Sequence, residues 1–173
     1  MIKSLIQNNE INWEKINLKR NEFLLKQGDK ERYFYYVISG ALRAYTFINE
    51  EELTIRFAYK GSIVASIPAY FSGEASELSI QAIRKCSLLR IRKKELETYI
   101  EAEKSRLILY NQMLVELVTS FYHREIDLLT QSPSDRIERI RKRSPQVFQE
   151  IPHKYIASYL RMSAETLSRL LNS

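Results

Sequence analysis

The polar side chains best placed to do chemistry lie in the last twenty residues, on a segment whose apolar spacing predicts a helix. Ser163 is a residue type that often caps helices, and it precedes three leucines that would share one helical face: Leu167, Leu170 and Leu171. Glu165 and Arg169 lie four residues apart and would share another face. An arginine can donate two hydrogen bonds to guanine, and a glutamate can accept one from the cytosine amino group. The pair therefore suits base recognition, although it could equally be an ion pair on a helix surface.

A second short helix is predicted just before this one. It carries Ile156, Ala157 and Leu160 on one face, and a tight turn at Arg161 follows. Two such helices form a helix-turn-helix, whose second helix enters the DNA major groove. We expect Glu165 and Arg169 to contact bases. Five further residues are candidates for phosphate contacts: Ser163, Thr166, His153, Lys154 and Tyr155. A positive φ at Arg161 would cost about 1 kcal/mol, since glycine is absent there.

The distribution of charge favours the same end of the chain. The protein has 173 residues and a net charge of +6. Residues 132–173 hold eight basic and four acidic side chains, whereas residues 1–131 hold nineteen and seventeen. A basic surface around the last two helices is what phosphate contact requires. The alternative is a solvated basic face on an ordinary helix.

Several classes of protein are excluded by composition. The one cysteine, Cys86, cannot form a disulfide within the chain or build a cysteine-based zinc or iron–sulfur site, and its apolar neighbours indicate a buried structural thiol. We find no paired carboxylates, glycine-rich phosphate loop, metal-ligand cluster or Ser/His/Asp arrangement, so we expect no enzyme, no metal and no cofactor. Without a signal peptide or an apolar span of membrane length, we expect a cytoplasmic protein that does not contact membranes.

The N-terminal half is predicted to be rich in β-strands. Candidate strands cover residues 33–38, 41–48, 53–58, 63–67, 80–83 and 88–91. The break at Ser39 and Gly40 suggests that the first two strands form a hairpin, and residues 2–16 are expected to be partly helical. Many short strands separated by glycine and charged turns predict a jelly roll, or double-stranded β-helix barrel.

The chain then becomes helical. Helices are predicted over residues 93–101, 105–129 and 136–143, the last one capped at Ser132. The long helix carries a heptad-like stripe: Leu107, Tyr110, Leu114, Leu117 and Phe121. Such a stripe suits a partner helix in a homodimer, and burial within its own subunit is the alternative. A second apolar flank with Met113, Val118 and Leu128 could pack back on the strands.

These elements, in this order, resemble the Crp/Fnr family of bacterial transcription regulators. The segments LLKQGD at residues 24–29 and YYVISG at residues 35–40 are similar to the opening strands of the family's cyclic-nucleotide-binding-like domain. The segments KYIASYL at 154–160 and ETLSR at 165–169 are similar to its DNA-binding helices. The resemblance implies an α+β fold with a sensor barrel at 1–104, a dimerisation helix at 105–131 and a helix-turn-helix domain at 132–173 that lacks the usual β-hairpin wing.

The resemblance also indicates where an effector would bind. Cyclic-nucleotide binders of the family carry a glycine, a glutamate and, about ten residues later, an arginine; the arginine neutralises the cyclic phosphate. The corresponding stretch here contains Gly61, Ala65, Ser66, Ile67, Ser76 and Glu77. Ala65 replaces the glycine, Ser66 replaces the glutamate, and Ser76 or Glu77 stands where the arginine should be. We therefore predict that cyclic AMP does not bind, and the sequence does not identify another effector.

The sequence thus favours a homodimeric transcription regulator whose partners are double-stranded DNA, a second copy of the chain and, by resemblance, RNA polymerase. Two such recognition helices would address half-sites about 34 Å apart. The alternative is a sensory or protein-interaction module whose terminal helices bind a partner protein and not DNA.

Overall fold

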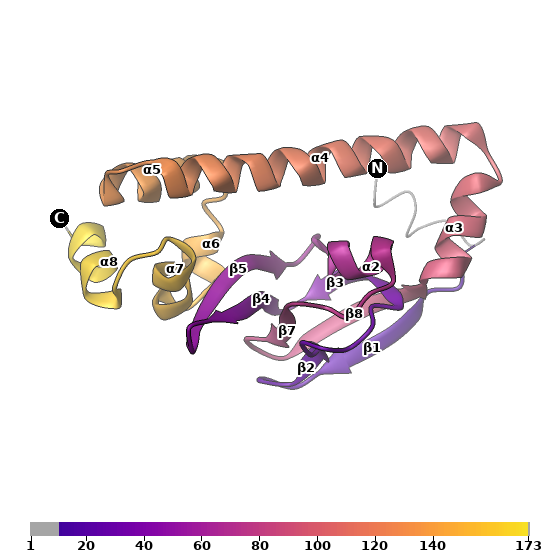
Figure 1. The fold of residues 1–173 in the computed structure, drawn as a ribbon, viewed down its shortest axis with the longest axis horizontal. Helices are drawn as coiled ribbons and strands as arrows, with labels where there is room; N and C mark the ends of the chain where they lie inside the picture. Colours follow the sequence, from indigo (N-terminus) through magenta and orange to yellow (C-terminus); the bar gives the residue numbers. More distant parts are fainter. Residues whose placement is uncertain (1–10, 173) are drawn as a thin grey trace.

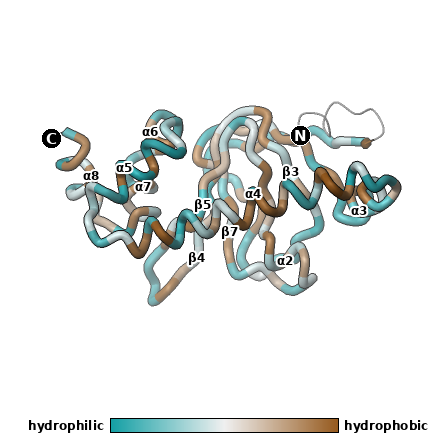
Figure 2. Tube along the Cα trace, turned by 90° about the horizontal axis from the view of Figure 1, so that it is seen from above, coloured by the Kyte–Doolittle hydropathy of each residue, from teal (hydrophilic) through white to brown (hydrophobic). Residues whose placement is uncertain are grey.

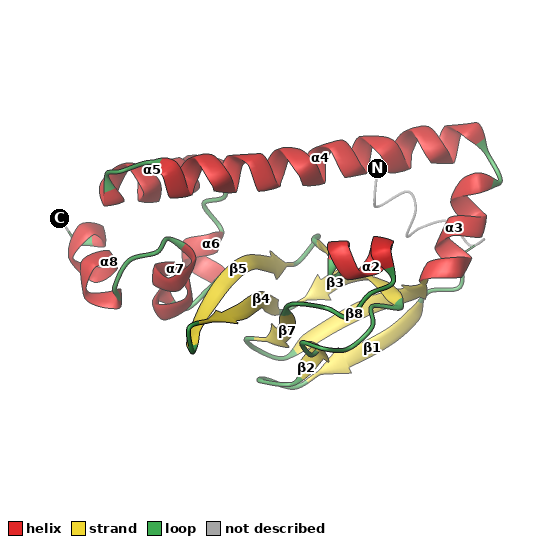
Figure 3. Cartoon of the chain, viewed as in Figure 1, coloured by secondary structure: helices red, strands yellow, loops and turns green. Residues whose placement is uncertain are grey.

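A sandwich of two antiparallel sheets forms the N-terminal half of the computed structural model, which describes residues 11–172 (Figures 1 and 3). The strands are β1 (Glu14–Leu18), β2 (Phe23–Leu25), β3 (Tyr33–Ser39), β4 (Ala41–Ile48), β5 (Glu51–Tyr59), β6 (Ile63–Val64), β7 (Ser79–Ala82) and β8 (Cys86–Arg92). One sheet has the order β1-β8-β3-β6 and the other β2-β7-β4-β5. This two-sheet architecture agrees with the jelly roll that the sequence predicts.

The core of the sandwich lies between the sheets. Alternate residues of each strand point to the same face, so Val37, Leu42 and Leu88 are fully buried there, together with Ile80. Cys86 joins this cluster, and its thiol donates to the carbonyl oxygen of Ala41 at 3.3 Å. The prediction of a buried structural thiol is confirmed.

The predicted hairpin between residues 33–38 and 41–48 is wrong. β3 pairs with β8 and β6, whereas β4 pairs with β5 and β7, so the chain changes sheets at Gly40. Gly40 has a φ of 95°, and a Cβ atom there would lie 2.4 Å from the carbonyl oxygen of Lys85. Only glycine fits this crossing, because any side chain would collide with the neighbouring backbone.

Seven helices are defined within the described residues. They are α2 (Ile67–Ser72), α3 (Lys93–Glu101), α4 (Lys104–Leu129), α5 (Pro133–Arg143), α6 (Val147–Glu150), α7 (His153–Tyr159) and α8 (Ala164–Leu171). The three predicted helices are confirmed as α3, α4 and α5. The strand predicted over 63–67 is too long, because α2 begins at Ile67. Of residues 2–16, which were expected to be partly helical, residues 14–16 lie in β1 and residues 2–10 lie outside the described part.

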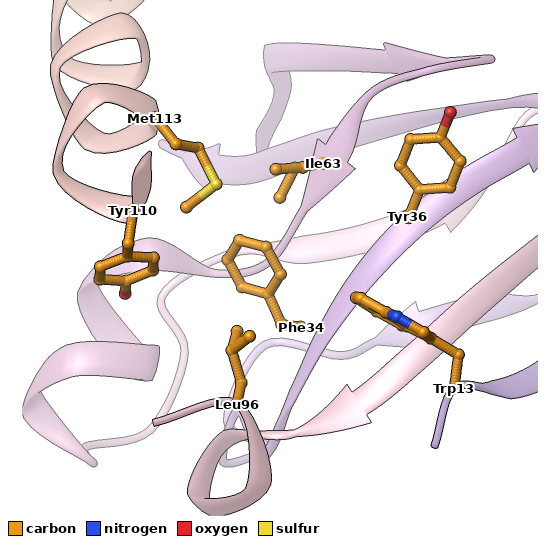
Figure 4. Close-up of a pocket in the computed structure, with 7 residues that line it drawn as sticks. All are labelled: Trp13, Phe34, Tyr36, Ile63, Leu96, Tyr110 and Met113. Atoms are coloured by element: carbon orange, nitrogen blue, oxygen red, sulfur yellow. The ribbon is translucent and has the colours of Figure 1, made fainter. Parts of the chain in front are cut away.

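The long helix α4 lies along the sandwich, with α3 at one end and α5 to α8 at the other (Figures 1 and 2). Met113 is buried, and Tyr110 and Leu114 pack with it against Phe34 and Leu96. Figure 4 shows several of these side chains around a gap of about 10 Å³, which is the size of one water molecule at most. This contact fixes one face of α4 on its own subunit.

The last four helices share their hydrophobic core with the sandwich. Ile140, Ile156, Leu160 and Leu167 form one cluster, which also contains Ala41 and Ile83 of the β-rich half. Asp127 of α4 is only 1% exposed and accepts hydrogen bonds from Arg139 and Arg143, so it joins α4 to α5. No helix in the described part of the chain is long and apolar enough to cross a membrane.

Candidate nucleic-acid interface and effector cavity

The two C-terminal helices are built as the sequence predicts. Ser163 precedes α8, and its hydroxyl accepts a hydrogen bond from the backbone N–H of Thr166 at 3.1 Å. This bond satisfies one of the free amides at the helix N-terminus. Leu167 is fully buried against Ile156 and Leu160 of the preceding helix segment, which sets the position of α8 relative to α7.

The turn between α7 and α8 has a left-handed residue where the sequence suggests one. Arg161 has a φ of 56°. The guanidinium of Arg136, from α5, donates to the carbonyl oxygen of Leu160 at 2.6 Å and to that of Arg161 at 3.4 Å. These bonds satisfy carbonyl groups at the end of α7, so the turn is held from α5.

The outward face of α8 carries Glu165, Ser168 and Arg169, all of them exposed. No ion pair joins Glu165 to Arg169 among residues 11–172, so the alternative of an ion pair on one helix is not what this geometry shows. The backbone amide of Glu165 at the helix N-terminus, followed by the Ser163 hydroxyl, lowers the pKa of the Glu165 carboxyl. The carboxylate and the guanidinium are both available to a partner.

The candidates for phosphate contact divide into two groups. His153 and Lys154, in the first turn of α7, are exposed, as is Ser163. Tyr155 is half-buried, because the guanidinium of Arg43 in β4 lies 4.2 Å from the centre of its ring. Tyr155 therefore faces the sandwich. Thr166 is also half-buried and takes part in the Ser163 cap.

Five of the eight basic residues in 132–173 are already used within the fold. Arg139 and Arg143 bind Asp127, and Arg136 holds the turn after α7. Arg141 and Lys142 lie within 3.6 Å and 3.5 Å of Glu138. Among residues 132–172, the exposed cations without a carboxylate partner are Lys154, Arg161 and Arg169, which lie on α7, the turn and α8.

A cavity of about 530 Å³ lies between the sandwich, α2 and α4. Apolar side chains from several strands make most of its wall, and α4 closes it with Leu117 and Phe121. The lining residues used below are Ala65, Ser66, Ile67, Arg56, Phe57 and Glu77. Four of the six predicted effector-site residues therefore line the cavity; Gly61 and Ser76 do not.

Two serines stand where a nucleotide-binding site would need an acid and a cation. The hydroxyls of Ser66 and Ser76 lie 2.8 Å apart, and both residues are almost fully buried. The carboxylate of Glu31 accepts the backbone N–H of Ser66 at 3.0 Å, and also those of Arg32 and Tyr33. Burial raises the pKa of the Glu31 carboxyl, against the effect of these hydrogen bonds. The charged residues that residues 63–78 contribute to the cavity lining are Glu74 and Glu77, so a phosphate there would meet carboxylates.

The predicted dimer stripe turns largely toward its own subunit. Tyr110 and Leu114 pack against the sandwich, Leu117 and Phe121 line the cavity, and Leu107 is exposed. The most exposed apolar residues of α4 form another stripe, which we call the outer stripe: Ile108, Val115, Val118, Tyr122 and Leu129. Val118 was expected to pack back on the strands, but it is 65% exposed.

Three groups were not found from the sequence: Glu31, which binds the backbone N–H of Ser66, Arg56 and Phe57 in the cavity wall, and Asp127 between α4 and α5. Asp127 had one available signal, since it lies on the apolar side of α4 between Ile126 and Leu128. Arg56 and Phe57 had none, because their partners are more than sixty residues away.

Solved structures with the same fold cover nearly all of the chain. FixK2 from Bradyrhizobium japonicum superposes with a TM-score of 0.79 at 17% identity, covering 94% of this chain and 84% of its own. The c-di-GMP responsive global regulator CLP from Xanthomonas campestris has a TM-score of 0.71 at 17% identity, covering 98% and 90%. A CooA mutant from Carboxydothermus hydrogenoformans has a TM-score of 0.71 at 15% identity, covering 99% and 82%. At these identities the likeness establishes the fold.

No curated protein matches the sequence. The family described as "Cyclic nucleotide-binding domain" matches residues 15–103, which contain the sandwich except for the first residue of β1, together with α2 and α3. With its two-sheet sandwich, the cavity between the sandwich and α4, and this match over half of its length, the chain belongs to the cyclic nucleotide-binding domain family.

Proposed function

We propose that this protein is a homodimeric, DNA-binding transcription regulator of the Crp/Fnr type, without catalytic activity and without a response to cyclic AMP. The observation that carries the proposal is the outward face of α8. Its Glu165 and Arg169 are exposed and unpaired in the described chain, and the buried Leu167 and Arg136 hold the helix in place. A rigid helix that presents an acid and an arginine is suited to base edges in the major groove.

The remaining exposed cations support this role. Lys154 and Arg161 flank α8 on the same pair of helices, where they can contact phosphates beside the groove. His153 and Ser163 are exposed there too. Tyr155 is the weakest of the predicted phosphate contacts, because Arg43 covers its ring.

A second copy of the chain would present a second recognition helix. The outer stripe of α4 repeats every seven residues at Ile108, Val115, Tyr122 and Leu129, which is the spacing of a two-helix seam. We therefore assign dimerisation to the outer stripe, with Leu107 at its edge. The inner residues Leu117 and Phe121 close the effector cavity of their own subunit.

Selection of bound sites from random DNA by the purified protein tests the proposal. We expect a two-fold symmetric consensus, and affinity that falls log-linearly with salt. Arg169→Ala should weaken operator binding by about 1–3 kcal/mol and relax the preference at one base pair. Arg84→Ala is the matched control, because Arg84 is exposed but lies outside α7 and α8 and binds Glu150.

If no sequence is enriched and Arg169→Ala changes nothing, the proposal is wrong. The terminal helices would then serve the alternative function, recognition of a partner protein.

A further inference from the structure

We propose that the cavity binds an apolar monocarboxylate, such as a medium-chain fatty acid, with its carboxylate on the guanidinium of Arg56. This inference rests on the proposed function, because it names the chemical class of that regulator's effector. It depends on the apolar wall of the cavity, on the free donors of Arg56 and on the acidic residues in the loop after α2.

The wall of the cavity suits a hydrocarbon chain. Its volume of about 530 Å³ lies in the range of small-molecule sites, about 300–1,000 Å³. The lining is mostly aliphatic or aromatic: Leu42, Ile55, Phe57, Val64, Leu78 and Leu117 are examples. A ligand that removes such surface from water gains free energy in proportion to its own apolar area.

Arg56 is the cation of the cavity wall whose guanidinium still has N–H donors for a ligand. Its guanidinium donates to the hydroxyl of Ser120 and lies 4.6 Å from the centre of the Phe121 ring. No carboxylate forms an ion pair with it among residues 11–172. A guanidinium has five N–H donors in a planar fork that matches a carboxylate, so most of this capacity is unused.

The surroundings of Arg56 favour an anion. Burial, followed by the charges of Arg124 and Arg143, lowers the pKa of its guanidinium, while the Tyr159 and Tyr59 hydroxyls act in the opposite direction. A bound carboxylate would compensate this half-buried positive charge. The other arginine of the wall, Arg43, already binds Glu52 and Gln81.

Near α2, by contrast, the charges of the cavity wall disfavour an anionic group. The other two charged residues of the wall, Glu74 and Glu77, are both acidic and lie in the loop after α2. The nearby amide of Ser66 is occupied by the carboxylate of Glu31. A second anionic group at this end would be repelled, so the ligand should carry one negative charge, at its Arg56 end.

A calorimetric titration of the full chain with dodecanoate, 1-dodecanol and cyclic AMP tests the inference. We expect dodecanoate to bind at micromolar concentration. The alcohol should bind about tenfold more weakly or worse, since it lacks the charge that Arg56 would recognise. Cyclic AMP should not bind and should not displace dodecanoate.

Arg56→Gln should reduce dodecanoate affinity by about tenfold or more and bring it close to that of the alcohol. Arg84→Gln is the matched control, because it removes an arginine outside the cavity and should bind like the wild type. Circular dichroism checks that both variants fold. If Arg56→Gln does not fold, the difference between dodecanoate and 1-dodecanol in binding to the wild type still tests the inference.

Equal binding of the acid and the alcohol, equal binding by Arg56→Gln and wild type, or absence of dodecanoate binding would each overturn the inference. Binding of cyclic AMP in competition with dodecanoate would overturn it as well. DNA selection is measured separately and without ligand. A symmetric operator without dodecanoate binding refutes only the ligand class, whereas dodecanoate binding without any operator refutes only the regulator.

Discussion

Arg161 stores strain in the turn that places the candidate recognition helix. A left-handed conformation costs an L-residue about 1–2 kcal/mol, and glycine avoids this cost. Glycine loses more conformational entropy on folding, however, which costs about 0.5–1 kcal/mol. With a φ of 56° at Arg161, Arg161→Gly should raise the free energy of unfolding by about 0.5–1 kcal/mol. Urea denaturation measures the change.

The control for this prediction is Arg161→Ala, which removes the same exposed side chain and keeps the strain. Its stability should stay near that of the wild type, because the Arg136 bonds go to backbone carbonyl groups and not to the Arg161 side chain. A variant with glycine that is no more stable than the alanine variant would show that the turn is unstrained.

Glu31 should contribute more to stability as the pH falls, which is the reverse of the usual effect of a carboxyl group. Burial raises its folded pKa above the ordinary value of 4.5, so the folded state holds its proton more tightly than the unfolded chain. This contribution is fully present below pH 4.5 and is lost as the pH rises through the folded pKa. The wild type should therefore gain stability relative to Glu31→Gln as the pH falls from 7 toward 4.5.

Urea denaturation of both proteins across that pH range checks the prediction, with the difference between them as the measured quantity. Other carboxylates cancel in this difference, since both proteins carry them. A gap that stays constant with pH, or that moves in favour of Glu31→Gln under acid, would mean that Glu31 is not held protonated more tightly in the fold.

At the scale of elements, α4 has two apolar flanks, and only one of them is covered. Val118 in the outer stripe is 65% exposed, and Val118→Lys would place a charge in the proposed two-helix seam. We expect this variant to be a monomer in sedimentation velocity, where the wild type is a dimer. Phe71→Lys, which changes a 50% exposed apolar residue on α2, should leave the dimer intact. If the wild type is itself a monomer, the outer stripe is not a dimer interface.

Elements with strong periodicity could be predicted from the sequence alone. The bounds of β4 and α3 agree with the prediction, and those of α4 and α5 differ by a few residues at most. Ser163 and Ser132 cap their helices as expected, because a cap depends on residues within one turn. β1 was missed because it is a mostly exposed strand at the edge of its sheet, with few buried side chains to signal it.

Features that depend on distant contacts could not be predicted. Ser39 and Gly40 read as a hairpin turn, yet β3 pairs with β8, whose partner residues lie about fifty to sixty positions later, and β4 pairs with β5 and β7. Both flanks of α4 have apolar residues at helical spacing, so the sequence could not decide which flank meets the sandwich. The cavity depends on Arg56 and Phe57, whose roles arise only when β5 packs beside α4 and α7.

At the scale of the whole molecule, β5 joins the cavity to the C-terminal helices. Phe57 lines the cavity and lies 5.2 Å, between ring centres, from Tyr159 of α7. The backbone N–H of Thr54 donates to the hydroxyl of Ser158 at 3.0 Å. Arg124 of α4 donates to the carbonyl oxygens of Ile55 and Thr54 at 2.6 Å and 2.9 Å. A shift of β5 on ligand binding would therefore reach α7 directly, which gives the proposed effector a physical route to the helices that we propose bind DNA.

The shared core of the two halves predicts that the chain unfolds as one unit. Ile156 of α7 is fully buried in a cluster that includes Ala41 and Ile83 of the sandwich. Trp13, the single tryptophan, packs with the cluster that contains Phe34 and Leu96 (Figure 4), so its fluorescence reports on the β-rich half. Far-UV circular dichroism reports mainly on the helices. The two midpoints should coincide in urea.

Ile156→Ala sharpens the test, because it removes buried apolar atoms from the cluster of the last four helices, whereas Trp13 packs against a different cluster. It should lower the free energy of unfolding by about 2–5 kcal/mol, and both signals should shift together. Lys154→Ala, an exposed change in the same helix, should move neither. If the helical signal were lost early while Trp13 kept its wild-type midpoint, residues 132–173 would behave as the separate domain that the sequence predicts. The contacts across β5 would then be too weak to carry a signal from the cavity to α8.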